Sequence, residues 1–248
     1  MQVLRCQPAE CDRLHGAVVV IDVLRSFTTC AYAFDRGAIE VLPVGSLADA
    51  QTLRRRHPEA LAIGAVGGGA PAPGLDLGNS PSQVAALDLR GRRVIQFTAG
   101  GMHALAACGR ARMLLAASLV NATATAAYLQ RLWPAAVTLV TTGAWVDRDG
   151  DEDHACADLI ADLLAGRNPP RAPFAARVRN SDFGRRFAAD TDPHLPRADL
   201  DCCAQVDRFD FAMPLNRLHD GFAMRPVPAA GGGGGRRGRR AFSAARSA

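Results

Sequence analysis

Residues 16–22 read GAVVVID, and this short run decides the fold class. Five apolar residues, Ala17–Ile21, stand between Gly16 and Asp22, and most of them are branched at the β-carbon. A continuous apolar run of this length, without polar alternation, is typical of a strand buried on both faces. Such strands occur in parallel sheets covered by helices on both sides, so the run predicts an α/β fold.

Outward from this strand, helical and strand patterns alternate along the chain. Residues 26–37 have helical apolar spacing that stops at Gly37, and residues 39–44 resume a strand pattern. A further helix is marked by Ser80 as N-cap and by Pro81 at the first helical position. The remaining predicted elements are helices over 47–56, 101–109 and 121–132 and strands over 61–64, 93–98, 111–118 and 136–141. The alternation predicts a three-layer fold, with a mostly parallel sheet and helices on both faces.

The chain divides into three predicted parts. An α/β main domain covers 1–166 and closes with a helix that ends at Gly166. Residues 167–227 are predicted to form a smaller C-terminal α/β subdomain or cap, with a short helix over 181–189 and a strand over 205–215. Residues 228–248 are mostly Gly, Arg, Ala and Ser, which predicts a disordered tail.

Composition excludes several classes of function. The chain has 248 residues and no lysine, which rules out a phosphate-loop lysine and a pyridoxal phosphate anchor. The net charge of +5 comes from five arginines beyond Val227, and the neutral remainder argues against nucleic acid as a partner. Seven cysteines without a repeated spacing favour reduced thiols and the cytoplasm. No segment has the length and hydrophobicity of a membrane span, so no membrane partner is expected.

The candidate site follows from the strand ends, because ligands of parallel sheets bind beyond the carboxyl ends of the strands. Asp22 is the strongest candidate, since a carboxylate that ends an apolar strand needs a metal, an arginine or backbone donors. The alternative for Asp22 is a helix cap or a salt bridge to Arg25, and Arg25 itself is expected to bind an anion. Asn79, Ser80 and Asn121 are ambiguous between capping a helix and binding a ligand.

Other familiar motifs fail in detail. The alternating acids after residue 146 resemble a calcium loop, but Glu152 occupies the position where that loop needs glycine. Cys30 and Arg36 have the spacing of a cysteine phosphatase loop, yet the residues between them favour a helix. The first strand is not followed by G-x-G-x-x-G, and G-x-S-x-G does not occur in the sequence. Dinucleotide binding and serine hydrolase chemistry therefore lack their usual signatures.

Seven segments carry the most distinctive sequence. In chain order they read IDVLRSFTT, GLDLGNSP, TAGG, SLVNATATAAYL, EDHACA, NSDFGRRF and DLDCCAQVDRFDFAMPL. Together, from about residue 16 to residue 215, they resemble the 2-phosphosulfolactate phosphatase family. The resemblance implies an α/β fold and a magnesium-dependent phosphatase that hydrolyses 2-phospho-3-sulfolactate to sulfolactate and phosphate, a step of coenzyme M biosynthesis. The implied partner is a small phosphorylated and sulfonated substrate, while the oligomeric state stays open, with a homo-oligomer as one alternative.

The strand ends and the resemblance together give the expected site. Catalytic roles are expected for Asp22, Arg25, Asp76, Asn79 and Glu152. Substrate binding is expected for Ser26, Ser80, Gly100, Gly101, Ser118 and Asn121. Magnesium prefers oxygen ligands, and its expected ligands are Asp22, Asp76 and Asp153.

One departure from the family pattern bears on activity. Where the family usually has Gly-Glu-Arg, this chain has Gly64 followed by Ala65 and Val66. The alternative hypothesis is therefore a weakened or inactive family member that binds a small anionic ligand. The TAGG turn is a milder departure from a Thr-Asn-Gly-Thr type of turn, because it keeps glycines for close backbone approach.

Overall fold

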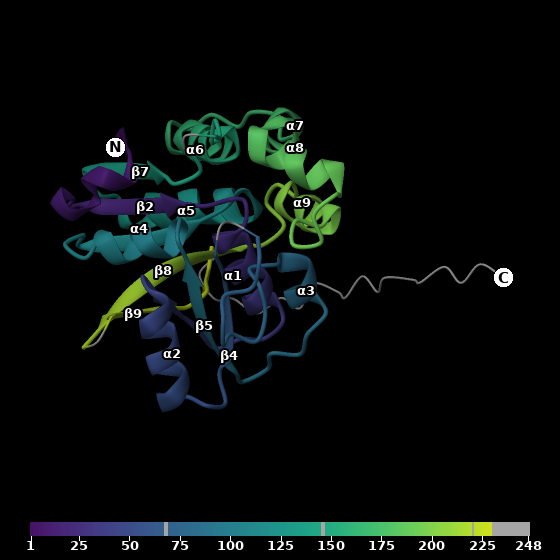
Figure 1. The fold of residues 1–248 in the computed structure, drawn as a ribbon. Helices are drawn as coiled ribbons and strands as arrows, with labels where there is room; N and C mark the ends of the chain where they lie inside the picture. The colour runs from purple at the N-terminus through teal and green to yellow at the C-terminus, as the bar shows by residue number, and fades with distance from the viewer. Residues whose placement is uncertain (67–68, 145–146, 220, 230–248) are drawn as a thin grey trace.

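The structure is a computed structural model that describes residues 1–66, 69–144, 147–219 and 221–229. It confirms the α/β fold, because a large and mostly parallel sheet is flanked by helices (Figure 1). Within these described ranges, no helix has the length and hydrophobicity needed to cross a membrane. All seven cysteines carry free thiols.

The run at residues 16–22 forms the strand that the sequence predicts. All five residues of β2 (Ala17–Ile21) are buried. Alternate side chains point to opposite faces, so Val20 packs into one hydrophobic cluster and Val19 into another. Helices cover both faces, which is why the strand is apolar throughout.

Two blocks of parallel strands make up most of the sheet. The first block has the order β1 (Gln2–Cys6), β7 (Ala136–Thr141), β2 and β6 (Met113–Ala117). The second block has the order β3 (Glu40–Val44), β5 (Arg93–Thr98) and β4 (Leu61–Ala65). The N-terminal strand β1 was not among the predicted elements.

The C-terminal part of the chain joins the two blocks. β8 (Phe211–Leu218) lies antiparallel to β6, β9 (Gly221–Met224) lies antiparallel to β8, and Met224 pairs with Val41 of β3. This hairpin, yellow-green in Figure 1, therefore completes the main sheet and does not form a sheet of its own. The division of the chain at residue 166 stays a prediction.

Most helices match the predicted ranges because their ends are marked in the sequence. Ser46 caps α2 by accepting a bond from the Asp49 backbone, and Ser80 and Ser181 cap their helices in the same way. The helices are α1 (Ser26–Asp35), α2 (Leu47–Arg56), α3 (Pro81–Ala85), α4 (Gly101–Ala107), α5 (Ala122–Leu132), α6 (Asp151–Leu164), α7 (Ala172–Asn180), α8 (Asp182–Ala189) and α9 (Arg197–Cys203). Short 3₁₀ turns are η1 (Pro8–Arg13) and η2 (Leu119–Asn121).

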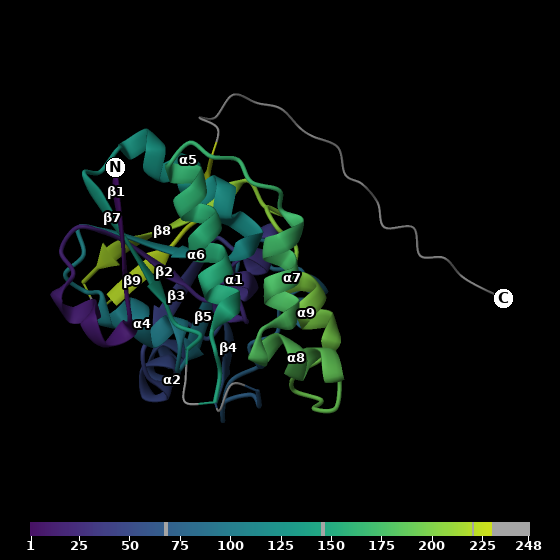
Figure 2. The ribbon, with the colours of Figure 1, turned by 90° about the horizontal axis from the view of Figure 1, so that it is seen from above.

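Three features of the C-terminal region differ from the prediction. Helices α7 and α9 were not expected; both lie beside α8 (Figure 2), and α7 also packs against α6. Residues 205–210 precede the strand instead of belonging to it. The predicted tail begins too early, because Val227–Pro228 form β10, which pairs with β8. The rest of that predicted tail, residues 230–248, lies outside the described residues.

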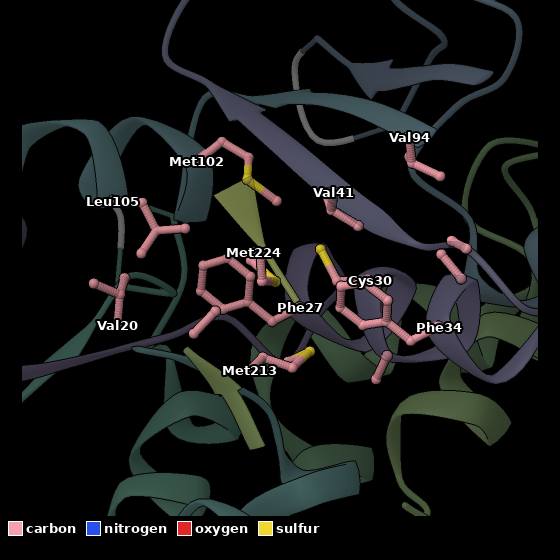
Figure 3. Packing of buried hydrophobic residues seen from close by; sticks show 14 of the residues in the cluster. Val20, Phe27, Cys30, Phe34, Val41, Val94, Met102, Leu105, Met213 and Met224 are labelled. Carbon is pink, nitrogen blue, oxygen red and sulfur yellow. The ribbon is translucent and has the colours of Figure 1, made fainter. Parts of the chain in front are cut away.

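The largest hydrophobic cluster ties the blocks and the hairpin together. Figure 3 shows Met213 and Met224 of the hairpin among Val20 of the first block and Val41 of the second, with Phe27 of α1 beside them. All five side chains are fully buried. The hairpin thus supplies part of the core that both parallel blocks share.

Candidate active site

A cavity of about 400 Å³ opens where strands of the two blocks end. Its wall contains Asp22 after β2, Thr142 after β7, Ala65 at the end of β4 and Thr98 at the end of β5. Residues from both blocks come together here, because the hydroxyl of Ser26, which follows β2, lies 3.0 Å from that of Thr98 at the end of β5. The carboxyl ends of strands from both blocks therefore surround one cavity. This agrees with the strand-end rule, by which ligands of parallel sheets bind beyond the carboxyl ends of the strands.

Asp22 is buried and held by hydrogen-bond donors from two helix starts. Its Oδ1 accepts the backbone N–H of Ser26 at 2.9 Å, and its Oδ2 accepts the Ser26 hydroxyl at 2.6 Å and the Gly101 N–H at 2.9 Å. Gly101 must be glycine for this approach, because a Cβ there would lie 2.7 Å from Asp22 Oδ2. Two backbone N–H groups and the Ser26 hydroxyl thus fix the carboxylate at the cavity wall.

Asp153 is a second buried carboxylate on the same wall. It comes from the first turn of α6, and its oxygens accept the backbone N–H groups of Val23 and Thr142, each at 2.8 Å. Burial raises the pKa of Asp153 well above its ordinary value, and the charges of Asp22 and Glu152 raise it further. Both cavity carboxylates are therefore fixed by donors that follow strand ends, those of β2 and β5 for Asp22 and those of β2 and β7 for Asp153.

Glu152 lies behind the cavity wall and does not line it. The side chain is 1% exposed, and its Oε2 has no hydrogen-bond partner in the described part of the chain. Burial raises the pKa of Glu152 to about 7, with Asp149 and Asp22 adding to the effect. Gly143 leaves the space for it, since a Cβ at that position would lie 2.6 Å from Glu152 Oε1.

Arg25 lines the cavity, but its positive charge is paired with Asp199, which does not line the cavity. Its Nη1 donates to Asp199 Oδ2 at 2.6 Å and to the carbonyl of His194 at 3.0 Å. Both side chains of this ion pair are almost fully buried. The guanidinium also lies 5.0 Å from the ring centroid of Phe187. The structure thus places Arg25 at the cavity in a buried ion pair, and its expected anion binding stays a prediction.

Two further arginines line the cavity and were missed by sequence reasoning. Arg148 precedes α6, and Arg186 lies on α8. Arg186 donates to Asp147 Oδ2 at 2.8 Å, and the Arg148 guanidinium lies 4.3 Å from the ring centroid of Phe183. Their segments were noted in the sequence only as an acidic loop and as NSDFGRRF, because no local pattern brings α8 to this cavity.

Comparison with known proteins gives the chain its place among enzymes. A family model described as 2-phosphosulpholactate phosphatase matches residues 5–217. The chain belongs to the 2-phosphosulfolactate phosphatase family. A relative from Carboxydothermus hydrogenoformans is 41% identical over 83% of this chain and 88% of its own length. A relative from Bacillus subtilis is 30% identical over 80% of this chain and 86% of its own length. Both are named probable 2-phosphosulfolactate phosphatase, and such enzymes are phosphoric monoester hydrolases.

Other site residues that the sequence predicts also reach this cavity. Gly100 lines it, and Asn79 lines it with its Oδ1 accepting the Gln96 side-chain amide at 3.0 Å. Ser26 lines it while its hydroxyl is bonded to Asp22. Ser80 does not line this cavity, because its hydroxyl donates to Asp199 at 2.7 Å.

Three of the predicted site residues lie away from the cavity. Asp76 forms an ion pair with Arg54 at 2.6 Å and accepts the backbone N–H of Ala62, so it is not brought together with Asp22. Ser118 and Asn121 are fully buried and form the two halves of a capping box at η2. Their polar atoms satisfy the end of β6 and the start of a helix, which is the capping alternative raised for Asn121.

The donor set at the cavity is compatible with magnesium. Among the described residues, no three His, Cys, Asp or Glu side chains converge on one point that could hold a metal ion. Asp22 and Asp153 nevertheless both line the cavity, and each charge is unfavourable for the other. Magnesium is typically bound by one or two carboxylates, with water and substrate phosphate as its other ligands. Two carboxylates without nitrogen or sulfur donors fit that requirement.

Proposed function

We propose that this protein is a magnesium-dependent phosphatase that hydrolyses 2-phosphosulfolactate to sulfolactate and phosphate. The observation that carries the proposal is the pair of buried carboxylates, Asp22 and Asp153, facing one cavity whose wall also holds arginines. Carboxylates suit a metal that binds phosphate, and arginines suit the other anionic groups of the substrate. The names of the relatives support the same substrate.

In this proposal the residues of the cavity have separate roles. Asp22 and Asp153 hold the magnesium ion, which would neutralise charge on the phosphoryl oxygens and lower the pKa of a bound water. Ser26 and Gly101 keep the Asp22 carboxylate oriented through three hydrogen bonds. The side-chain amide of Gln96 donates to the side-chain oxygen of Asn79. The amide N–H groups of Asn79 can then donate to an anionic ligand.

The proposal is tested by phosphate release from 2-phosphosulfolactate with and without magnesium. Asp22→Asn removes a carboxylate charge from the proposed metal site and keeps its shape, so we expect kcat/KM to fall by roughly 100-fold or more. EDTA should abolish turnover, and added magnesium should restore it. Asp76→Asn is the matched control, because Asp76 pairs with Arg54 outside the cavity and its loss should leave kcat within about 3-fold of the unmodified protein. Full activity in EDTA would refute the metal dependence.

A second candidate function is anion binding with little turnover. Ala65 lines the cavity and is 5% exposed, so a methyl group stands where the family usually has a glutamate. The neighbouring Val66 is 41% exposed. If the missing pair limits catalysis, Ala65→Glu/Val66→Arg should raise kcat above that of the natural chain. Strong phosphatase activity of the natural chain, unchanged in this variant, would eliminate the second candidate.

The proposed setting of the reaction follows from the family and the composition. Coenzyme M biosynthesis is the pathway that the substrate suggests, and the cytoplasm is the compartment that fits seven free thiols. The absence of a nucleic-acid partner and the alternative of a homo-oligomer stay predictions from the sequence.

A further inference from the structure

The arginines at the cavity differ in what balances their charge. Arg25 is paired with Asp199, which is fully buried and lies behind the wall. Arg186 pairs with Asp147 at 2.8 Å, and Nε of Arg148 lies 3.9 Å from the same carboxylate. Asp147 itself lines the cavity, and its side chain is 61% exposed. A ligand anion that displaces Asp147 would therefore leave that carboxylate in water, whereas taking Arg25 from Asp199 would leave a buried charge behind.

The guanidinium groups of Arg148 and Arg186 both contact the aromatic ring of Phe183 on α8. The guanidinium carbon of Arg148 lies 4.3 Å from the ring centroid of Phe183, and that of Arg186 lies 5.9 Å from it. Phe183 is itself buried and packs edge-on against Phe187 at 5.0 Å between centroids. Cation–π contact with a fixed ring limits the rotation of both arginine side chains. The two groups are thus partly preorganised before a ligand binds.

The carboxylate of Asp147 already reaches both guanidinium groups. Its Oδ2 accepts from Arg186 at 2.8 Å, and its Oδ1 lies 3.9 Å from Arg148 Nε. One exposed anionic group is therefore shared between two arginines at the edge of the cavity. A ligand anion of similar size but with more oxygens would make the same contacts and more of them.

On the phosphatase activity proposed above, we infer that Arg148 and Arg186 bind the sulfonate of the substrate and thereby set its specificity. The phosphate is assigned to the part of the cavity that holds Asp22 and Asp153, the proposed metal ligands. A sulfonate has three oxygens, one more than a carboxylate, so it can accept bonds from two guanidinium forks at once. In the free protein Asp147 takes the place of the sulfonate at Arg186.

The inference is tested with two substrates that differ only in the sulfonate, 2-phosphosulfolactate and 2-phospholactate. For Arg186→Gln and Arg148→Gln we expect the ratio of kcat/KM between the two substrates to fall by about 10- to 100-fold, mainly through KM for the sulfonated substrate. Arg185→Gln is the matched control, because Arg185 lies on the same helix, pairs with Asp182 and does not line the cavity. Its substrate ratio should equal that of the unmodified protein.

Binding without turnover separates this inference from the proposed function. Titration calorimetry with sulfolactate should show about 10- to 100-fold weaker binding to Arg186→Gln and about 2- to 5-fold tighter binding to Asp147→Asn, in which the competing carboxylate is gone. Sulfolactate binding that changes in neither variant would overturn the inference, whatever the activity. Absence of phosphatase activity together with these binding changes would refute the proposed function and leave the sulfonate site supported.

Discussion

At the scale of single residues, we predict that the buried Glu152 makes the stability of the protein depend on pH. Its pKa is raised by burial from an ordinary value of 4.5 to about 7. Between these two values the unfolded chain has lost the proton while the folded chain keeps it, so stability should fall as the pH rises through this window. Glu152→Gln cannot ionise at this position. Between pH 4.5 and pH 7, the unfolding free energy of the unmodified protein should therefore fall by roughly 3 kcal/mol more than that of the variant. Urea unfolding in EDTA measures the difference.

The control for this residue is a glutamate that water can reach. The side chain of Glu59 is 56% exposed, and its own backbone N–H, His57 and Arg93 lower its pKa. Glu59 is therefore mostly ionised in the folded and the unfolded chain between pH 4.5 and pH 7, and Glu59→Gln should give a pH curve parallel to that of the unmodified protein in this window. If Glu152→Gln also ran parallel to it, the buried glutamate would have no raised pKa in solution.

At the scale of elements, one side chain of α9 holds two separate segments, the residue before α1 and the start of α3. Asp199 accepts Nη1 of Arg25 at 2.6 Å, the hydroxyl of Ser80 at 2.7 Å and the backbone N–H of Ser82 at 3.0 Å. Asp199→Asn removes the charge and leaves Arg25 buried without its acid, which should lower the unfolding free energy by about 3–5 kcal/mol. Chemical unfolding measures this loss. Asp201→Asn on the same helix removes only an exposed pair with Arg179 and should cost less than about 1 kcal/mol, and equal losses in the two variants would contradict the role of α9.

At the scale of the whole molecule, the sequence predicts the features that depend on neighbouring residues, such as helix bounds and the residues at strand ends. The bounds of α2 and the start of α3 at Ser80 were predicted because caps and apolar spacing fix them within a few residues. The strand-end rule likewise indicated Asp22 and Gly100, which line the cavity. The insertion of β8 and β9 between the blocks could not be predicted, because the choice of strand partner depends on contacts distant in sequence.

The same limit explains which site residues were missed or misplaced. Arg148 and Arg186 come together only because α8 packs near the end of β7, and no spacing in the sequence records that contact. Ser118 and Asn121 stand at a strand end as expected, yet a capping box uses their polar atoms. Capping and ligand binding use the same residue types, so only the fold distinguishes them.

The hairpin of β8 and β9 connects the two blocks whose strand ends form the cavity. A substitution in it therefore tests whether the two blocks unfold together. Met224 pairs with Val41 of β3 and Leu215 of β8, and it is fully buried in the shared core (Figure 3). Met224→Ala should lower the unfolding free energy by about 2–5 kcal/mol, and near the lowered midpoint activity should disappear together with secondary structure. Leu218→Ala in the same hairpin, where the side chain is 47% exposed, should cost less than about 1 kcal/mol. Thermal unfolding followed by circular dichroism and by phosphate release provides the comparison. Two separate transitions in Met224→Ala would mean that the blocks fold independently and that the hairpin does not couple them.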